Sequence, residues 1–127
     1  MWYSEVSTVR IRAVEARLVT IPLNPPRRIA RRNLRRREYT LVRVRTEEGI
    51  EGLGFCLGGA PIPMFIRHIF APQLKGRSPF ETERIWEEMY HEILLLGRRG
   101  AGIRALSAVD IALWDIKGKV TGQPLAR

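Results

Sequence analysis

Residues 103–118, IRALSAVDIALWDIKG, decide the fold of this chain. On a helical projection at about 100° per residue, one arc of about 160° carries only small or apolar side chains. Its members are Ala105, Leu106, Ala108, Val109, Ala112, Leu113 and Ile116. Gly118 and Gly122 follow as stop signals. The pattern predicts a helix over roughly 102–117 whose apolar arc packs on the rest of the domain.

The other side of this helix is more apolar than a solvent-facing surface needs to be. Ile103, Ile111 and Trp114 lie there among polar and charged positions. Large exposed apolar patches usually mark interfaces. A C-terminal segment that folds back could also cover them, but the short remainder of the chain contains a glycine and a proline. We therefore favour a partner surface outside this sequence.

The N-terminal half is typical of β-strands. Apolar and charged residues alternate over residues 9–21, with a slip near Ala13-Val14, and again over 39–46. Glu47-Glu48-Gly49 supplies a turn, and residues 50–55 form the returning strand. Glycines within that last strand indicate close approach of another backbone. Together these segments predict a three-stranded antiparallel meander.

Two loops interrupt this half. Prolines at positions 22, 25 and 26 should stop the first strand, because proline has no N–H to donate to a ladder. Residues 27–37 then carry seven arginines and few apolar side chains, and we interpret them as a long surface loop. Residues 58–63 predict a second loop.

Helical signals fill the second half. A short helix is expected over 64–70, ending near Ala71-Pro72. Ser78-Pro79-Phe80-Glu81 reads as a capping box that starts a helix running to Leu96, closed by Gly97. Strands followed by three or four helices predict an α+β fold.

Length and composition place the chain among ordinary globular domains. Its 127 residues fit one domain, and 45% hydrophobic with 28% charged residues lies outside the disordered range. No apolar run approaches the about 18 residues that span a bilayer, and residues 1–5 show no signal peptide. The single cysteine, Cys56, cannot form an internal disulfide. We therefore expect a cytoplasmic protein with no membrane association.

The net charge of +9 is concentrated in one segment. The seven arginines between positions 27 and 37 leave only two positive charges for the rest of the chain. Nucleic-acid binding is disfavoured, because no aromatic residue interleaves these arginines and no helix-turn-helix or RNA-binding signature accompanies them.

The C-terminal helix also carries a resemblance to a known family. Residues 108–119, followed by Gly122-Gln123-Pro124-Leu125, resemble the segment that ends the capping domain of mandelate racemase and muconate lactonizing enzymes, in the enolase superfamily. Residues 71–79 and 46–54 resemble that family's helix–helix loop and second hairpin, in the same order. The resemblance extends from Val9 to Leu125. It implies an extension at 1–8, a capping domain at 9–125, and at 126–127 the start of a C-terminal TIM-type barrel that this chain lacks.

In this family the absent barrel holds Mg²⁺ on three carboxylates and the base that abstracts a proton α to a carboxylate. The resemblance therefore assigns no catalytic and no metal-binding residue to this chain, and the fragment alone should be inactive. Mg²⁺ is expected only in the full enzyme. Neither His68 and His91 nor Asp110 and Asp115 have the spacing of a metal site, and no base is positioned beside Cys56.

The resemblance implies two specificity loops, at about 23–39 and 55–63, that close over the barrel mouth. Arginines suit bidentate recognition of a carboxylate. Candidate substrate contacts are Arg27, Arg28, Arg31, Arg32, Tyr39, Phe55 and Cys56. The alternative is a solvated, mobile loop. Candidate contacts to the barrel are Ile103, Ile111 and Trp114.

Three functions stay open at this point. The first is a cap of an acid-sugar dehydratase or racemase, favoured by the basic, polar first loop. The second is the cap of a cycloisomerase or an amino-acid or dipeptide epimerase of the same superfamily. The third is a free-standing anion-binding or dimerisation module without catalysis. The expected partners are the barrel, a small carboxylate substrate and further copies of the same chain.

Overall fold

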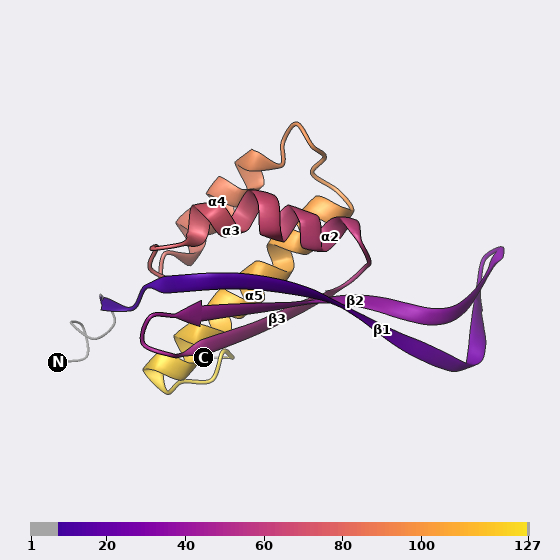
Figure 1. Ribbon diagram of the computed structural model, residues 1–127, viewed down its shortest axis with the longest axis horizontal. Helices are drawn as coiled ribbons and strands as arrows, with labels where there is room; N and C mark the ends of the chain where they lie inside the picture. Colours follow the sequence, from indigo (N-terminus) through magenta and orange to yellow (C-terminus); the bar gives the residue numbers. More distant parts are fainter. Residues whose placement is uncertain (1–7, 127) are drawn as a thin grey trace.

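One antiparallel sheet organises the protein. The computed structural model describes residues 8–126 (Figure 1). Strands β1 (Ile11–Ile29), β2 (Arg32–Thr46) and β3 (Glu51–Leu57) lie in the order β1-β2-β3, and both neighbouring pairs are antiparallel. Helical segments follow from Pro61 to Thr121. The predicted meander and α+β class are therefore confirmed.

The arginine segment is a β-hairpin, so our prediction of a long loop was wrong. β1 and β2 remain paired to Ile29 and Arg32, on either side of a turn in which Ala30 has φ 52°. The prolines do interrupt the ladder, between Pro22 and Arg27, but pairing resumes beyond them. β1 is an edge strand, and an edge strand tolerates proline because one of its sides needs no ladder donor.

This hairpin extends well past the third strand. β3 ends where Leu57 pairs with Tyr39, so residues 21–37 form a two-stranded projection, which we call the arm. Figure 1 shows the arm continuing to one side of the molecule, beyond the helices. Nearly all its side chains are exposed. Because neither face of the arm is buried, apolar and polar residues do not alternate along its sequence.

The first helix begins earlier and ends later than predicted. α2 (Pro61–Met64), the π-helix η1 (Phe65–Phe70) and α3 (Ala71–Leu74) follow one another without a break. Pro72 does not end the helix, because the preceding turn is a π turn in which the Ala71 N–H donates to the Ile66 carbonyl. A widened turn of this kind allows the helix to continue through proline, although proline has no N–H to donate.

The two later helices also differ from prediction at their ends. α4 (Thr82–Glu92) begins after the expected capping box, because the Ser78 hydroxyl accepts from the Phe80 N–H rather than capping the helix. α4 stops before Leu96, and residues 93–96 form turns. α5 (Ala101–Thr121) runs past Gly118 and ends at Gly122, in the left-handed conformation.

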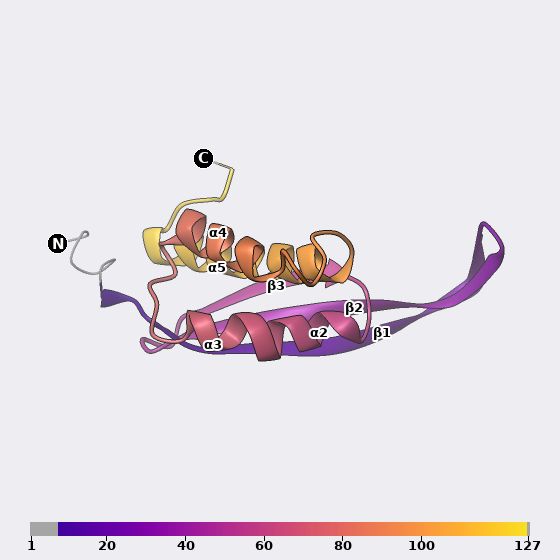
Figure 2. The same cartoon turned by 90° about the horizontal axis from the view of Figure 1, so that it is seen from above.

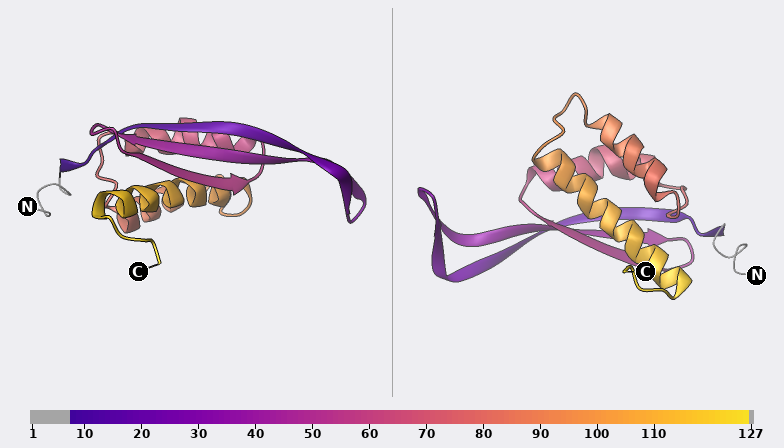
Figure 3. Two further views of the ribbon diagram at one scale, coloured as in Figure 1. Left: turned by 90° about the horizontal axis from the view of Figure 1, so that it is seen from below. Right: turned by 180° about the vertical axis from the view of Figure 1, so that it is seen from behind.

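All helices gather on one side of the sheet (Figures 2 and 3). α5 lies over β3 and β2, while α2, η1 and α3 lie over β1. The predicted apolar arc of α5 is fully buried, together with Val42 and Val44 of β2. Gly52 and Gly54 let α5 approach closely, since a Cβ on Gly54 would lie 1.9 Å from the Ala108 carbonyl oxygen. The opposite face of the sheet is open.

Asp115 connects α5 to β3, the edge strand on the other side of the sheet from β1. Its Oδ2 accepts from the Leu53 N–H at 2.9 Å and pairs with Lys119 Nζ at 2.9 Å. Burial alone would raise the pKa of this carboxyl, but the Leu53 hydrogen bond and Lys119 hold the pKa below its usual value. Asp110 differs, because burial raises its pKa despite the nearby Lys117.

Asp115→Asn should lower the free energy of unfolding by about 1–2 kcal/mol at neutral pH. A depressed folded-state pKa stabilises the fold above the unfolded pKa, and this stability is lost as pH falls through the folded pKa. The difference between wild type and Asp115→Asn in urea melts should therefore shrink in acid. Asp110→Asn is the matched control: its raised pKa predicts unchanged or increased stability at neutral pH. Equal losses in both variants would contradict the assignment.

Candidate functional site

A groove runs along the arm to the place where the arm leaves the body of the domain. It has a volume of about 860 Å³ and runs between the arm, the end of β3 and the start of α5. Its polar lining includes Arg32, Arg35, Arg36, Arg37, Glu38 and Arg104. Five of these six side chains are cationic, so the groove suits an anion.

Hydrogen bonds fix the floor of the groove. The Gly58 N–H donates to the Glu38 carbonyl at 2.9 Å, and the Thr40 hydroxyl donates to the Gly58 carbonyl at 3.1 Å. Arg104 reaches across from α5 and donates from Nη1 to the Leu57 carbonyl at 3.0 Å. Segments from β2, β3 and α5 are thereby held together at one place. The arm therefore starts from a fixed base.

Six of the seven arginines of the arm have no ion-pair partner among residues 8–126. Within residues 8–126, only Arg36 among the seven forms an ion pair, with Glu38 at 3.7 Å. That pair is partly exposed and contributes little to stability. Like charges held close together repel, so stability of the domain does not explain their clustering. An anionic ligand or surface would relieve that repulsion.

The predicted loop arginines divide by position. Arg32 lines the groove, whereas Arg27 and Arg28 are not among its lining residues and pair in register with Leu34 and Asn33, which are. Arg31 lies in the turn at its tip. All four are exposed. Sequence reasoning missed Arg104, because only the fold brings the first turns of α5 next to the arm.

The other three predicted contacts do not form one cluster. Tyr39 and Phe55 share the open face, with ring centroids 6.5 Å apart. Cys56 points to the helix side, where burial raises the pKa of its thiol despite Arg104 and a hydrogen bond with Thr40. A thiol with a raised pKa is a poor nucleophile. The alternation of a strand explains the separation, since neighbouring residues face opposite ways.

The outer face of α5 carries the second candidate surface. Ile111 and Trp114 are 40% and 41% exposed, while Ile103 packs against the core. Lys117 Nζ lies 4.3 Å from the centre of the Trp114 ring. A cleft lined by Trp86, Asp110 and Trp114 separates α4 from α5 here.

The chain end does not cover this surface within the described residues. The Gln123 N–H donates to the Gly118 carbonyl, and Leu125 lies close to Gly118 at the end of α5. This segment therefore turns back on the last turn of the helix and leaves Trp114 exposed. The role of Ile103, Ile111 and Trp114 as barrel contacts remains a prediction.

The described part of the chain offers neither a metal cluster nor a membrane span. Among residues 8–126, no three His, Cys, Asp or Glu side chains gather closely enough to hold a metal ion. The same residues contain no helix with the length and apolar character needed to cross a bilayer. The residues present therefore do not fit a Mg²⁺ site.

Comparison with known families agrees with the fold. Residues 11–127 match the profile described as mandelate racemase / muconate lactonizing enzyme, N-terminal domain. The chain belongs to this family. It represents the family's N-terminal domain, in line with the resemblance seen in α5.

Characterised relatives are longer than this chain. It is 36% identical over 118 residues to D-galactarolactone cycloisomerase from Agrobacterium fabrum, which covers 93% of this chain and 31% of that protein. It is 35% identical over 85 residues to L-rhamnonate dehydratase from Saccharopolyspora erythraea, covering 67% of this chain and 22% of that protein. The chain thus spans less than a third of the length of these relatives.

Solved structures of the family superpose closely. A mandelate racemase/muconate lactonizing enzyme-like protein from Rubrobacter xylanophilus gives a TM-score of 0.85 at 32% identity, covering 92% of this chain and 32% of that one. A racemase from Streptomyces coelicolor with bound magnesium gives 0.78 at 34% identity, covering 85% of this chain and 32% of that one.

Proposed function

We propose that this domain caps the active site of a Mg²⁺-dependent enzyme that abstracts a proton α to the carboxylate of an acid sugar. The arm and its groove would hold the end of the substrate away from the reacting carbon. The observation that carries the proposal is the set of arm arginines without carboxylate partners. Relatives named for L-rhamnonate dehydration and D-galactarolactone cycloisomerisation support this substrate class.

The domain's own contribution is binding and exclusion of water. Arginine side chains can bind a carboxylate or hydroxyl groups with paired N–H donors. A closing arm also removes water from the site and holds the substrate in position. Mg²⁺ would stabilise the charge that develops when the proton leaves. Its ligands belong to the proposed C-terminal barrel, because the described residues offer no site for it.

Extending the reading frame past Arg127 tests this function. We expect a continuation of about 250 residues, the length of a TIM-type barrel. The encoded protein should turn over at least one hexonic acid or acid-sugar lactone only when Mg²⁺ is supplied. A stop codon directly after Arg127, or no turnover across such a panel, would overturn the proposal and favour a free-standing binding module.

Trp114 should report docking of the barrel. In the isolated domain Trp114→Ala should cost only about 1–2 kcal/mol, because the ring is already 41% exposed and only its covered part is lost. In the longer protein the same change should cost about 3 kcal/mol or more, because the ring would then be buried. Urea melts of both forms measure the difference. Equal costs would show that the barrel does not cover this surface.

A further inference from the structure

A single carboxylate lies among the arginines of the groove. Of the described residues that line it, Glu38 is the only acidic one, beside five arginines. Glu38 follows the arm directly on β2, and its side chain is 35% exposed. A negative charge at this position weakens the attraction of the groove for anions. Attraction of an anion therefore does not account for Glu38.

The backbone after β3 leaves space for this carboxylate. The Gly58 N–H donates to the Glu38 carbonyl at 2.9 Å, which holds the two segments together. A Cβ on Gly59 would lie 2.0 Å from Glu38 Oε2, so the carboxylate occupies the space that a side chain at position 59 would fill. Gly59 does not have a positive φ, and its backbone conformation therefore does not require glycine. The glycine instead makes room for the Glu38 carboxylate at the floor of the groove.

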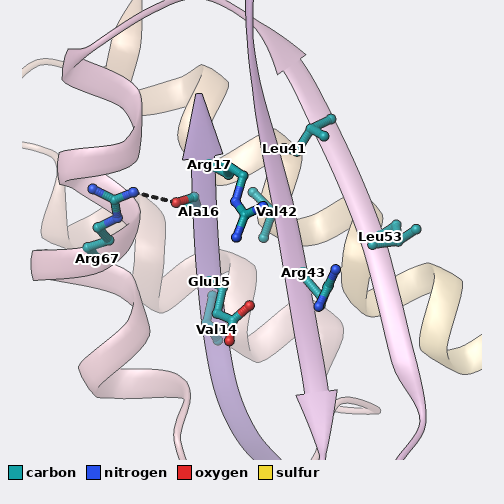
Figure 4. A pocket seen from close by; sticks show the side chains of 9 residues that line it. All are labelled: Val14, Glu15, Ala16, Arg17, Leu41, Val42, Arg43, Leu53 and Arg67. Atoms are coloured by element: carbon teal, nitrogen blue, oxygen red, sulfur yellow. Dashed lines mark hydrogen bonds between the residues drawn. The ribbon is translucent and has the colours of Figure 1, made fainter. Parts of the chain in front are cut away.

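A second hollow with arginines lies on the open face of the sheet and shows a different arrangement (Figure 4). It has a volume of about 490 Å³, and its lining includes Arg43 of β2. There a carboxylate is the counter-charge of its neighbours, since Glu51 pairs with Arg43 at 3.8 Å and with Arg45 at 3.1 Å. Among residues 8–126, Glu38 pairs only with Arg36, at 3.7 Å, although five arginines line its groove. Its carboxylate is therefore available to accept hydrogen bonds from a ligand.

Glu38 and Arg36 together offer an acceptor and a donor. Their ion pair is weak and the Arg36 side chain is 70% exposed, so the pair can open to admit a polar group. A hydroxyl group can donate to the carboxylate and accept from the guanidinium at the same time. A carboxylate of the ligand could only accept, and it would lie against the like charge of Glu38. This part of the groove therefore fits a hydroxyl group and disfavours a carboxylate.

We propose that Glu38 makes the site selective for acid sugars with one carboxylate over those with two. This inference rests on the function proposed above, in which the groove holds the end of the substrate away from the reacting carbon. In an acid sugar with one carboxylate that end carries a hydroxyl group, which donates to Glu38. In a diacid it carries a second carboxylate, which Glu38 repels. The arginines attract both anions and do not distinguish the two classes, so the distinction depends on Glu38.

Kinetics of the longer protein test this selectivity. Each hexonate, which has one carboxylate, is compared with the hexarate of the same configuration, which has two. The wild type should have an at least about tenfold higher kcat/KM for the hexonate. Glu38→Gln keeps the shape of the side chain and removes its charge, so it should lower this ratio at least about tenfold, mainly by raising kcat/KM for the hexarate. Glu47→Gln is the matched control, because it removes the same charge from the turn at the other end of β2 and should leave the ratio unchanged.

Gly59→Ala tests the position of the carboxylate separately from its charge. The added methyl group takes the space of Glu38 Oε2, so the carboxylate must move away while its charge stays on the chain. The obstacle is the flexible end of a side chain, so the fold should be retained, and circular dichroism should confirm this. The variant should lose selectivity as Glu38→Gln does. Wild-type selectivity in Gly59→Ala would overturn the proposed hydrogen bond.

Binding to the 127-residue chain separates this proposal from the proposed function. The probes are D-gluconate and D-glucarate, titrated at millimolar concentration in salt that screens long-range attraction, with the amide NMR signals of Gly58 and Gly59 as the readout. The wild type should bind gluconate at least about fivefold more tightly than glucarate, and Glu38→Gln should remove this preference.

The two tests fail in different ways. Binding of neither probe, or glucarate bound as tightly as gluconate by the wild type, would overturn the role of Glu38. Equal kcat/KM ratios in the wild type and Glu38→Gln of an active longer protein would do the same and leave the proposed function standing. A domain that prefers gluconate, in a longer protein that turns over no acid sugar, would support the role of Glu38 in binding and overturn the proposed function.

Discussion

Gly54→Ala should lower the free energy of unfolding by more than about 3 kcal/mol, the largest stability effect we expect from a single methyl group here. An added Cβ would lie 1.9 Å from the Ala108 carbonyl oxygen and 2.9 Å from the Ala112 backbone nitrogen. Both obstacles belong to the backbone of α5, so no side-chain rotation relieves the clash. Either the helix moves off the sheet or the strand bends, and both outcomes disturb the core beneath.

The control separates packing from backbone conformation. Gly97 has φ 115°, and a Cβ added there would meet nothing within 4 Å. Gly97→Ala should therefore cost only the backbone term, about 1–2 kcal/mol. Gly52→Ala, with the Ala112 carbonyl oxygen 2.1 Å from the new Cβ, should resemble Gly54→Ala. Urea melts of the three variants measure this, and similar losses at Gly54 and Gly97 would refute the close helix–strand contact.

Local periodicity predicted the buried side of α5 correctly. All seven residues of its apolar arc are buried, because side-chain direction along a helix follows directly from spacing. The glycines of β3 likewise indicated a close backbone. Their partner could not be identified from sequence, because the contact joins residues more than 50 positions apart.

The arm was missed for a physical reason. Alternation reveals a strand only when one face is buried, and the arm has no face against the core. Its three prolines then indicated a loop, although they lie in an edge strand that tolerates them. Pro72 likewise led us to end the first helix too early. The π turn before it lets the helix continue although proline donates no hydrogen bond.

Only part of the candidate site could be predicted from the sequence. The arginine cluster was evident, but Arg104 joins the groove only through the packing of α5 against β3. The separation of Phe55 from Cys56 was available in advance, since adjacent residues of a strand face opposite ways. Grouping them by proximity in sequence overlooked that rule.

Removal of the arm should abolish substrate recognition and leave the fold intact. Replacing residues 23–35 with Asn-Gly joins Pro22 to Arg36, which are paired in register, through a favoured two-residue turn. The arm contributes nothing to the hydrophobic core, so the thermal midpoint of the domain should change by less than about 4 °C. In the longer protein, kcat/KM for the acid sugar should fall about 100- to 1,000-fold, because positioning and exclusion of water are lost together.

A charge-preserving variant distinguishes recognition by arginine from attraction by charge. Lysine at positions 32, 35 and 37 keeps the charge of the groove but removes the paired N–H donors. If the arginines bind the substrate directly, this variant should lose most of the activity that the arm deletion loses, mainly in kcat/KM. If the arm acts only by long-range electrostatic attraction of the substrate, the lysine variant should keep its activity, and added salt should reduce that activity steeply. Full activity without the arm would exclude both roles and leave the arginines to serve a partner other than the substrate.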